Sequence, residues 1–209
     1  MKGQRVQKDL HTPKGDLMVE GPIPPEEMRR LVLDEGLTSF RPPKRQHGAL
    51  MTVAEMPLGR VVAAHDGRTI VGYVAFHPPD EIERWSQASI SEILEMGALE
   101  VSPAWRGCGV ASALLEVSFA DDFFEDYIVI STEFYWHWDL KGTGLSIWEY
   151  QDVLKRLLGR AGMREMSTDE PDVVCHPANM LMVRVGSRVH PEALLEFERL
   201  RHRGRGRTV

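Results

Sequence analysis

The sequence has few cysteines and no long hydrophobic run, and both absences narrow the class of protein. Cys108 and Cys175 are the only cysteines, which excludes a disulfide framework and a cysteine-rich metal cluster. No segment approaches the roughly 20 apolar residues of a membrane helix. The polar start of the chain also lacks the apolar region of a signal peptide. We therefore expect a cytoplasmic protein that does not bind a membrane.

The sequence also has fewer positively charged than negatively charged residues, and its histidines lack the spacing of metal ligands. The 25 Lys and Arg residues are outnumbered by 31 Asp and Glu, and the resulting net charge of -6 disfavours general nucleic-acid binding. The eight histidines show no H-x-x-x-H spacing, so we expect no metal site. What remains is a chain of 209 residues, 43% hydrophobic and 27% charged, which is typical of one globular domain with a full core.

The most informative stretch covers residues 93–116, ILEMGALEVSPAWRGCGVASALLE. A short apolar run ends at Val101, and after a Ser-Pro turn the glycine-containing segment 106–111 leads into a helical pattern. Glycines let a ligand approach the backbone closely. The first amides of a helix have no intrahelical acceptor and lie at the positive end of the helix dipole. The stretch therefore predicts a site for a phosphate or pyrophosphate group.

The spacing of the glycines shows which of the known phosphate-binding motifs this segment matches. Neither Gly107 nor Gly109 begins a G-x-x-x-x-G-K-[ST] loop, and Ser112 stands where the dinucleotide fingerprint needs its third glycine. Arg106, Gly109 and Ala111 match a different pattern, which resembles the [RQ]-x-x-G-x-[GA] coenzyme A loop of the GCN5-related N-acetyltransferase superfamily. The alternative is a strand, turn and helix that contain two glycines by chance.

This resemblance implies acetyl-CoA as the co-substrate, with no metal. In that superfamily the loop amides hold the pyrophosphate, and the edge of the preceding strand pairs with the pantetheine arm. Carried onto this sequence, the resemblance implies the following cofactor-binding residues: Leu99, Val101, Arg106, Gly107, Cys108, Gly109, Val110 and Ala111.

The order of the predicted elements agrees with the same superfamily. We expect an α+β fold, an α/β/α sandwich in which helices flank a mixed, mainly antiparallel sheet. One domain is predicted over residues 16–200, with an N-terminal extension at 1–15 and a basic tail at 201–209. Strands are predicted at residues 16–20, 61–65, 69–76, 95–101, 127–132, 163–168 and 179–185. Helices are predicted at residues 26–35, 44–55, 110–120, 146–160 and 191–200, with a helix or lid at 80–94.

A block of contiguous aromatic residues refines the resemblance. Residues 135–138, YWHW, cannot all face one core from a regular strand or helix. Together with FRPP at 40–43, ERWS at 83–86, WEY at 148–150 and HPAN at 176–179, the block resembles the acetoin-utilisation acetyltransferases of the superfamily. This similarity covers nearly the whole chain except the basic C-terminus. It implies acetyl transfer to a lysine of acetyl-CoA synthetase, which inactivates that enzyme.

Acetylation of a lysine calls for a general base. A lysine has a pKa near 10.4, so forming its free amine at pH 7 costs about 4.6 kcal/mol. Glu95 lies 11 residues before Arg106, the spacing of the general base in histone acetyltransferases of this superfamily, and is our first candidate. Glu133 is the second, because it ends the next strand and reaches the same cleft if the strands splay. Glu100 is third, because it points to the opposite face. For each, a solvated surface carboxylate is the alternative.

A general acid for the leaving thiolate is harder to assign. Many relatives place a tyrosine four residues before the glycine that ends the fourth helix, but the corresponding residue here is Leu158. Tyr150, our first candidate, Tyr135 or His137 could take this role, or no acid is needed because a CoA thiolate is a fair leaving group.

Three functions stay open from the sequence. The first is acetylation of a protein lysine, which the whole-chain resemblance favours. The second is acetylation of a small amine in the same fold, and the third is an acyl-CoA sensor without catalysis. The basic run at 199–207 could touch the phosphates of the cofactor or an acidic partner, but an alternating Arg and Gly tail is more often disordered, and it is left out of the site.

Overall fold

The computed structural model describes residues 4–87 and 90–203, which form two units that share strand β6, Ile93–Val101. The first unit contains the chain up to His77 and the segment Met96–Phe123. The second contains the segment Pro78–Glu95 and the chain from Phe124 onward. The predicted base Glu95 therefore belongs to the second unit, and the predicted coenzyme A loop belongs to the first.

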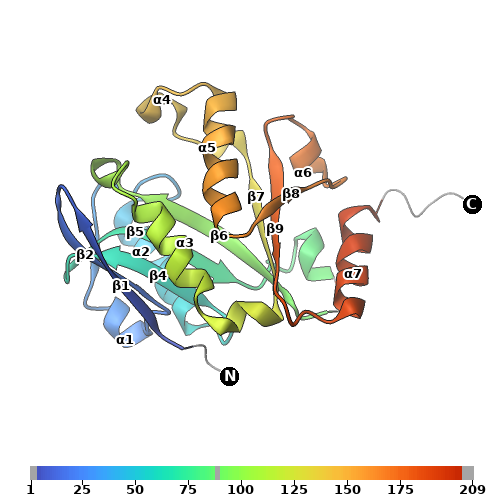
Figure 1. Cartoon of the computed structure of the whole chain (residues 1–209), viewed down its shortest axis with the longest axis horizontal. Helices are drawn as coiled ribbons and strands as arrows, with labels where there is room; N and C mark the ends of the chain where they lie inside the picture. Colours follow the sequence, from blue (N-terminus) through green and yellow to red (C-terminus); the bar gives the residue numbers. More distant parts are fainter. Residues whose placement is uncertain (1–3, 88–89, 204–209) are drawn as a thin grey trace, which may run out of the picture. The chain divides into compact units, whose positions relative to one another are not determined.

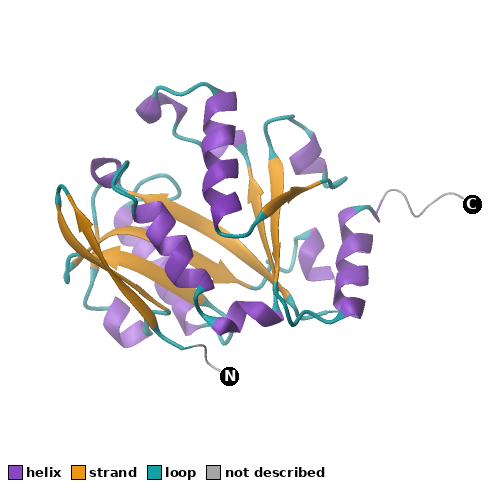
Figure 2. Ribbon diagram, viewed as in Figure 1, coloured by secondary structure: helices purple, strands orange, loops and turns teal. Residues whose placement is uncertain are grey.

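The first unit is a sheet with a helix against each face (Figures 1 and 2). Its strands follow the order β1-β2-β4-β5-β6, and β3 lies parallel to β5. Tyr73 of β5 packs in the cluster that contains Leu50 of helix α2, whereas the preceding residue, Gly72, faces helix α3. The elements are β1 Val6–Thr12, β2 Gly15–Gly21, α1 Pro25–Met28, β3 Val32–Leu33, α2 Pro43–Glu55, β4 Arg60–His65, β5 Thr69–His77, the 3-10 turn η2 Pro103–Trp105 and α3 Val110–Phe119.

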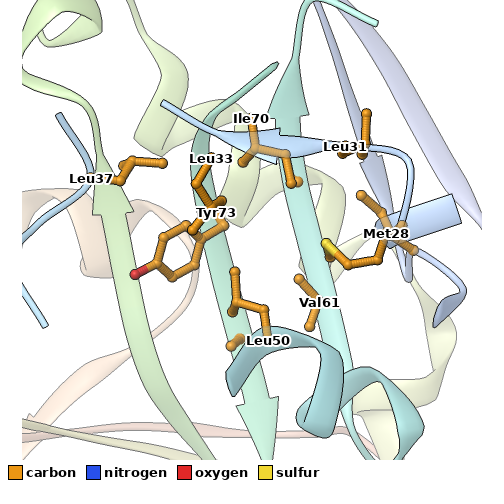
Figure 3. Close-up of a cluster of buried hydrophobic side chains, with 11 residues drawn as sticks. Met28, Leu31, Leu33, Leu37, Leu50, Val61, Ile70 and Tyr73 are labelled. Atoms are coloured by element: carbon orange, nitrogen blue, oxygen red, sulfur yellow. The ribbon is translucent and has the colours of Figure 1, made fainter. Parts of the chain in front are cut away.

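One core cluster of this unit lies on the α2 side of the sheet. Figure 3 shows Leu50 of α2, Val61 of β4 and Tyr73 of β5 in one cluster with side chains from the N-terminal segment. Met28 and Leu37 are fully buried there. Because burial of each such side chain contributes about 1.5 to 3 kcal/mol, this cluster holds the segment before α2 firmly on the sheet.

The second unit is built around strands β7 and β9. Its strands follow the order β6-β7-β9-β8; β7 runs parallel to the start of β6 and antiparallel to β9. The core includes Trp85, Ile93, Ile130 and Phe197. The elements are η1 Arg84–Gln87, η3 Asp122–Asp126, β7 Ile128–Glu133, η4 Tyr135–His137, α4 Leu140–Thr143, α5 Ile147–Arg160, β8 Arg164–Met166, α6 Pro171–Val174, β9 Met180–Val185 and α7 Pro191–Arg201.

The pairing between β6 and β7 is short. In the described part of the chain it joins Ile93–Glu95 to Ile128–Ile130 and ends there. The later residues of β6 therefore do not have β7 as a hydrogen-bonding neighbour, and they lead to the turn at Ser102 and the glycine loop.

The predicted fold class is confirmed, and the structure corrects several element boundaries. The polar residues before Gly15 form strand β1, which pairs with β2 along its whole length. The helix predicted at 26–35 ends at Met28, and the chain continues as β3, where exposed Val32 precedes buried Leu33. The acidic stretch 80–94 contains only the short turn η1 in its described part, and β6 begins two residues earlier than predicted.

At the C-terminus, α7 extends to Arg201, and residues 204–209 of the predicted basic tail lie outside the described residues. None of the helices that the structure describes is both long enough and apolar enough to cross a membrane.

Candidate active site

The glycine loop lies between the end of β6 and the start of α3, as the sequence predicted. Strand β6 ends at Val101, η2 follows, and α3 begins at Val110. Gly107 and Gly109 have φ angles of 75° and 83°, in the left-handed region that favours glycine. Among the described residues, apart from each glycine's two chain neighbours, no heavy atom lies within 4 Å of the position that a side chain would take at either glycine, so the outer side of the loop is open.

The start of α3 has amides available for an anion. Its N-cap residue is Gly109, and no side chain caps the helix there. The first intrahelical bond runs from the Ala113 amide to the Gly109 carbonyl over 3.0 Å. Buried Val110 and Leu114 anchor the helix on the sheet. A helix N-terminus with uncapped amides and an open glycine loop is suited to hold a phosphate group.

Two sets of contacts hold the loop in place. Ser102 is buried, its amide donates to the Val71 carbonyl over 2.8 Å, and its hydroxyl donates to Asp34 over 2.7 Å. Lys14, at the tip of the β1-β2 hairpin, donates to the Ala104 carbonyl. Sequence reasoning missed both, because each joins segments that are far apart in the chain and carry no motif.

Glu95, the first candidate for the base, is buried on β6. Glu95 and Ile130 of β7 are register partners, and Glu95 is 9% exposed. Burial, followed by the charge of the Glu83 carboxylate and a hydrogen bond with it, raises the pKa of Glu95 to about 8; Asp80 adds to this rise. A carboxyl group with a pKa near the working pH is an effective proton acceptor once it ionises.

Glu133, the second candidate, ends β7 and is half-buried. It accepts a hydrogen bond from the Ser131 hydroxyl over 2.7 Å, and burial raises its pKa despite this bond. In the register, Glu133 lies three residues beyond Ile130, the partner of Glu95. Because side chains alternate along a strand, this odd offset directs Glu133 and Glu95 to opposite faces of the sheet.

Glu100, the third candidate, has both carboxylate oxygens engaged. The Tyr73 hydroxyl donates to one oxygen over 2.6 Å, and the Ser39 amide donates to the other over 2.7 Å. Both Tyr73 and Glu100 are buried. These bonds join β5, β6 and the segment before α2, so Glu100 has a structural role in the first unit.

The aromatic block forms a layered surface in the second unit. Phe134 stacks on Trp136 with ring centroids 4.7 Å apart, and Trp138 stacks on Tyr150 at 5.3 Å. The Tyr135 ring lies 4.2 Å from the ring of His176. Trp136 is 49% exposed, and the Trp148 side chain, which stacks on His176, is 51% exposed. The aromatic residues therefore pack on one another and leave two indole rings open to solvent.

Tyr150 and His137, two of the three possible general acids, differ in their surroundings. Tyr150 lies in the first turn of α5, which begins at a capping box formed by Ser146 and Glu149, and its ring is held against Trp138. His137 is exposed at the end of η4. Leu158, at the position where many relatives carry tyrosine, is fully buried and forms part of the core.

The structure thus groups the predicted residues by unit. All of the predicted cofactor-binding residues, together with the third base candidate, Glu100, lie in the first unit. Glu95, Glu133 and Tyr150 lie in the second. Among residues 4–87 and 90–203, no group of three or more His, Cys, Asp or Glu side chains is arranged to hold a metal ion.

The mixed sheet and the uncapped, open glycine loop after β6 define an N-acetyltransferase of the GNAT class. A model described as the Acetyltransferase (GNAT) family matches residues 27–126, which include this loop. The chain belongs to that family and, within it, to the group of acetoin utilization proteins named AcuA. GNAT enzymes use acetyl-CoA as their co-substrate.

The similarity to this group extends over almost the full length of the chain. The chain is 46% identical to AcuA of Bacillus subtilis (strain 168) over 193 residues, which is 92% of each protein. It is 45% identical to AcuA of Bacillus licheniformis over 198 residues, 95% of this chain and 94% of that protein. The crystal structure of an acetoin utilization protein from Exiguobacterium sibiricum 255-15 superposes with a TM-score of 0.96 at 42% identity, over 98% of this chain and 97% of that one.

The structural role of Glu100 can be tested by Tyr73→Phe. This substitution removes a hydrogen bond to a buried carboxylate, so the free energy of unfolding should fall by about 1 to 3 kcal/mol. Urea denaturation followed by circular dichroism measures the change. Ser39→Ala is the matched control, because the bond from Ser39 comes from its backbone amide, and it should leave stability nearly unchanged. Equal stability of Tyr73→Phe and the wild type would exclude this role.

Proposed function

We propose that this protein transfers the acetyl group of acetyl-CoA to a lysine side chain of a protein, and that the acceptor protein is acetyl-CoA synthetase, which is inactivated. The observation that carries acetyl-CoA binding is the open loop with two left-handed glycines at the uncapped start of α3. The similarity to AcuA proteins over more than nine tenths of the chain supports a role in acetoin utilisation.

The cofactor is assigned to one continuous segment. The amides of Gly107 to Ala111 would hold the pyrophosphate, where open space and the helix dipole favour an anion. Arg106, half-buried at the start of the loop, adds a positive charge close to this site. Leu99 and Val101 lie on β6 beyond the end of its pairing with β7, and their backbone groups are suited to pair with the pantetheine arm.

We assign the proton transfers to an acidic and an aromatic side chain of the second unit. Acetyl-CoA supplies the activated acetyl group. Glu95 takes a proton from the lysine ammonium, so that the neutral amine can attack the thioester carbonyl. Tyr150 is the group assigned to return a proton to the thiolate that leaves. Because the pKa of Glu95 is about 8, the ionised and active fraction of this base increases as the pH rises through that value.

The aromatic surface favours a protein acceptor over a small amine. Trp136 and Trp148 each expose about half of their surface, although the same residues also stack on Phe134 and His176. Large, partly exposed aromatic side chains are enriched at protein interfaces, and an indole face attracts a lysine ammonium. A small amine has no need of such a surface. Acetylation of a small amine and acyl-CoA sensing without catalysis are the alternatives.

The proposed function predicts where the acetyl group goes. With radiolabelled acetyl-CoA, the label should enter a protein band in a cell lysate, and it should enter purified acetyl-CoA synthetase while the activity of that enzyme declines. Scintillation counting of protein and small-molecule fractions measures the distribution. Label found only in small molecules would identify a small-amine acetyltransferase. Tight binding of acetyl-CoA without transfer to any amine would identify a sensor.

The cofactor assignment predicts that Gly109→Asp weakens acetyl-CoA binding by at least about tenfold, because the side chain fills the open side of the loop and repels the diphosphate. Isothermal titration calorimetry measures the affinity. Gly67→Asp is the matched control: Gly67 also has a positive φ, of 97°, and open space, but it lies in the β4-β5 turn. Unchanged affinity in folded Gly109→Asp would refute the loop assignment.

The assignment of the base predicts that Glu95→Gln lowers turnover about 100-fold to 10,000-fold at neutral pH, while acetyl-CoA affinity stays near that of the wild type. The loss should shrink at high pH, where free amine forms without a base. Steady-state kinetics across a pH series measure both effects. If Glu133→Gln shows this loss and Glu95→Gln does not, the base is Glu133. If neither variant is impaired, the enzyme acts by positioning a neutral amine.

A further inference from the structure

We propose that the exposed face of Trp148, together with the carboxylate of Asp152, forms a cation site that binds a second positively charged side chain of the acceptor protein, distinct from the lysine that is acetylated. The inference rests on the proposed function, because it concerns how a protein acceptor is recognised. Trp148 and Asp152 are specificity-determining residues in this role and take no part in the chemical step.

Contacts between aromatic rings hold the indole of Trp148 in place. The indole stacks on the ring of His176, with centroids 6.4 Å and planes 20° apart, and the Tyr135 ring lies 4.2 Å from the same imidazole. The Nδ1 atom of His176 accepts a hydrogen bond from the Ala178 amide over 3.1 Å. Because this nitrogen accepts a bond, it carries no proton, and the imidazole is uncharged. The ring that supports Trp148 therefore does not repel a cation.

The indole of Trp148 keeps an open face despite this stacking. Trp148 is 51% exposed although His176 lies against it, so we infer that the exposed part is the face turned away from His176. The buried residues of α5 are Gln151 and Leu158, which means that Trp148 is not part of the buried side of this helix. Among the aromatic side chains, an indole face attracts a cation most strongly. Trp148 therefore presents a fixed surface of the kind that binds an ammonium or guanidinium group.

The charge that accompanies this face on α5 is negative. Asp152 is exposed and lies four residues after Trp148, a spacing that makes the two side chains neighbours on the helix surface. The first basic residue of α5 is Lys155, which pairs with Glu165 over 2.9 Å. Arg156 follows, about 12 Å further along the helix axis than Trp148. A cation on the indole face therefore has a carboxylate as its neighbour on the helix.

The N-terminal end of α5 does not oppose a cation at Trp148. A helix N-terminus carries a partial positive charge. In α5 this charge is offset by Glu149, whose Oε2 atom accepts hydrogen bonds from the Ser146 hydroxyl over 2.7 Å and the Ser146 amide over 2.8 Å. These bonds lower the pKa of Glu149, so its carboxylate is ionised at neutral pH. The residue that follows Trp148 thus adds a second negative charge to this end of the helix.

The cation that suits this site is not the lysine that reacts. An indole face and a carboxylate both favour an ammonium over a neutral amine, so they oppose the loss of the proton that acetylation requires. A side chain that keeps its charge throughout turnover meets no such conflict. Arginine suits the site best, because its guanidinium stays protonated and stacks flat on an aromatic ring. We therefore expect the acceptor protein to place a basic residue on Trp148 while a different lysine is acetylated.

Steady-state kinetics with two acceptors test the cation site. One acceptor is purified acetyl-CoA synthetase, and the other is Nα-acetyl-lysine amide, which has one amine and no second positive charge. In Trp148→Ala the KM for the synthetase should rise about twofold to thirtyfold, the range expected for the loss of a cation–π contact, while kcat stays near the wild-type value. Asp152→Asn should raise the same KM. The KM for Nα-acetyl-lysine amide should not change in either variant.

The matched control is Val153→Ala. Val153 is 41% exposed on the same helix, and its substitution should leave the KM for both acceptors at the wild-type value. If Trp148→Ala does not fold, Asp152→Asn decides the test, because the side chain that it changes is exposed. An equal rise in KM for both acceptors would show that the substitution only disturbs the structure, and this result would overturn the proposal.

A binding measurement without turnover gives a second readout. Nuclear magnetic resonance follows the indole N–H signal of Trp148, which is assigned by its loss in Trp148→Phe, while a lysine-free peptide of alternating arginine and glycine is added. The signal should move with this peptide but not with its citrulline counterpart, which has nearly the same shape and no charge. The response should weaken in Asp152→Asn. Equal responses to the two peptides would overturn the proposal.

The two measurements also separate the cation site from the proposed function. If the arginine peptide moves the Trp148 signal but no protein is acetylated, the cation site stands and the assigned acceptor is wrong. If the synthetase is acetylated and its KM is unchanged in folded Trp148→Ala, the assigned reaction stands and the cation site is rejected.

Discussion

The hydrogen-bond pairing of strand β6 is the constraint on which the rest of the structure depends. Its first three residues pair with β7, and the pairing ends at Glu95. The strand then continues to Val101 and delivers the chain to the glycine loop, where Ser102 is held by Val71 and Asp34. The same strand therefore carries a buried carboxyl group in the second unit and leads along the chain to the open glycine loop in the first unit. A shift of one residue in its register would turn Glu95 to the other face of the sheet, away from Ile130.

Much of the fold could be predicted because the relevant signals are local. Two glycines before an apolar helix indicate a loop with positive φ angles, and the Asp66-Gly67 turn between apolar runs indicates the β4-β5 hairpin. Strand β3 was missed because two residues carry no periodicity. Strand β1 was missed because its side chains are mostly exposed and polar, so its sequence lacks the alternation of apolar and polar residues that marks a half-buried strand. The structural role of Glu100 depends on a partner remote in sequence, the Tyr73 hydroxyl.

The aromatic block shows how contiguous aromatic residues are accommodated without a common core. Phe134 and Trp136 stack as a pair, whereas Tyr135, between them, turns to His176 and donates its amide to Asn179 over 3.0 Å. Adjacent residues thus take different partners, because successive side chains of an extended or 3-10 segment point in different directions. Mutual stacking holds the rings in place while part of their surface stays exposed. Such a preordered surface loses little conformational entropy when a partner binds.

The burial of Glu95 is better explained by its proposed catalytic role than by stability. The pKa of this carboxyl is raised from 4.5 to about 8 in the folded protein, so between these two pH values the folded state binds a proton that the unfolded state has released. Stability contributed by the neutral group is therefore complete below about pH 4.5 and is lost as the pH rises through about 8. An apolar residue at this place would stabilise the fold without this loss. A buried acid is retained here at a cost to stability, and the role of general base that we propose for Glu95 would offset that cost.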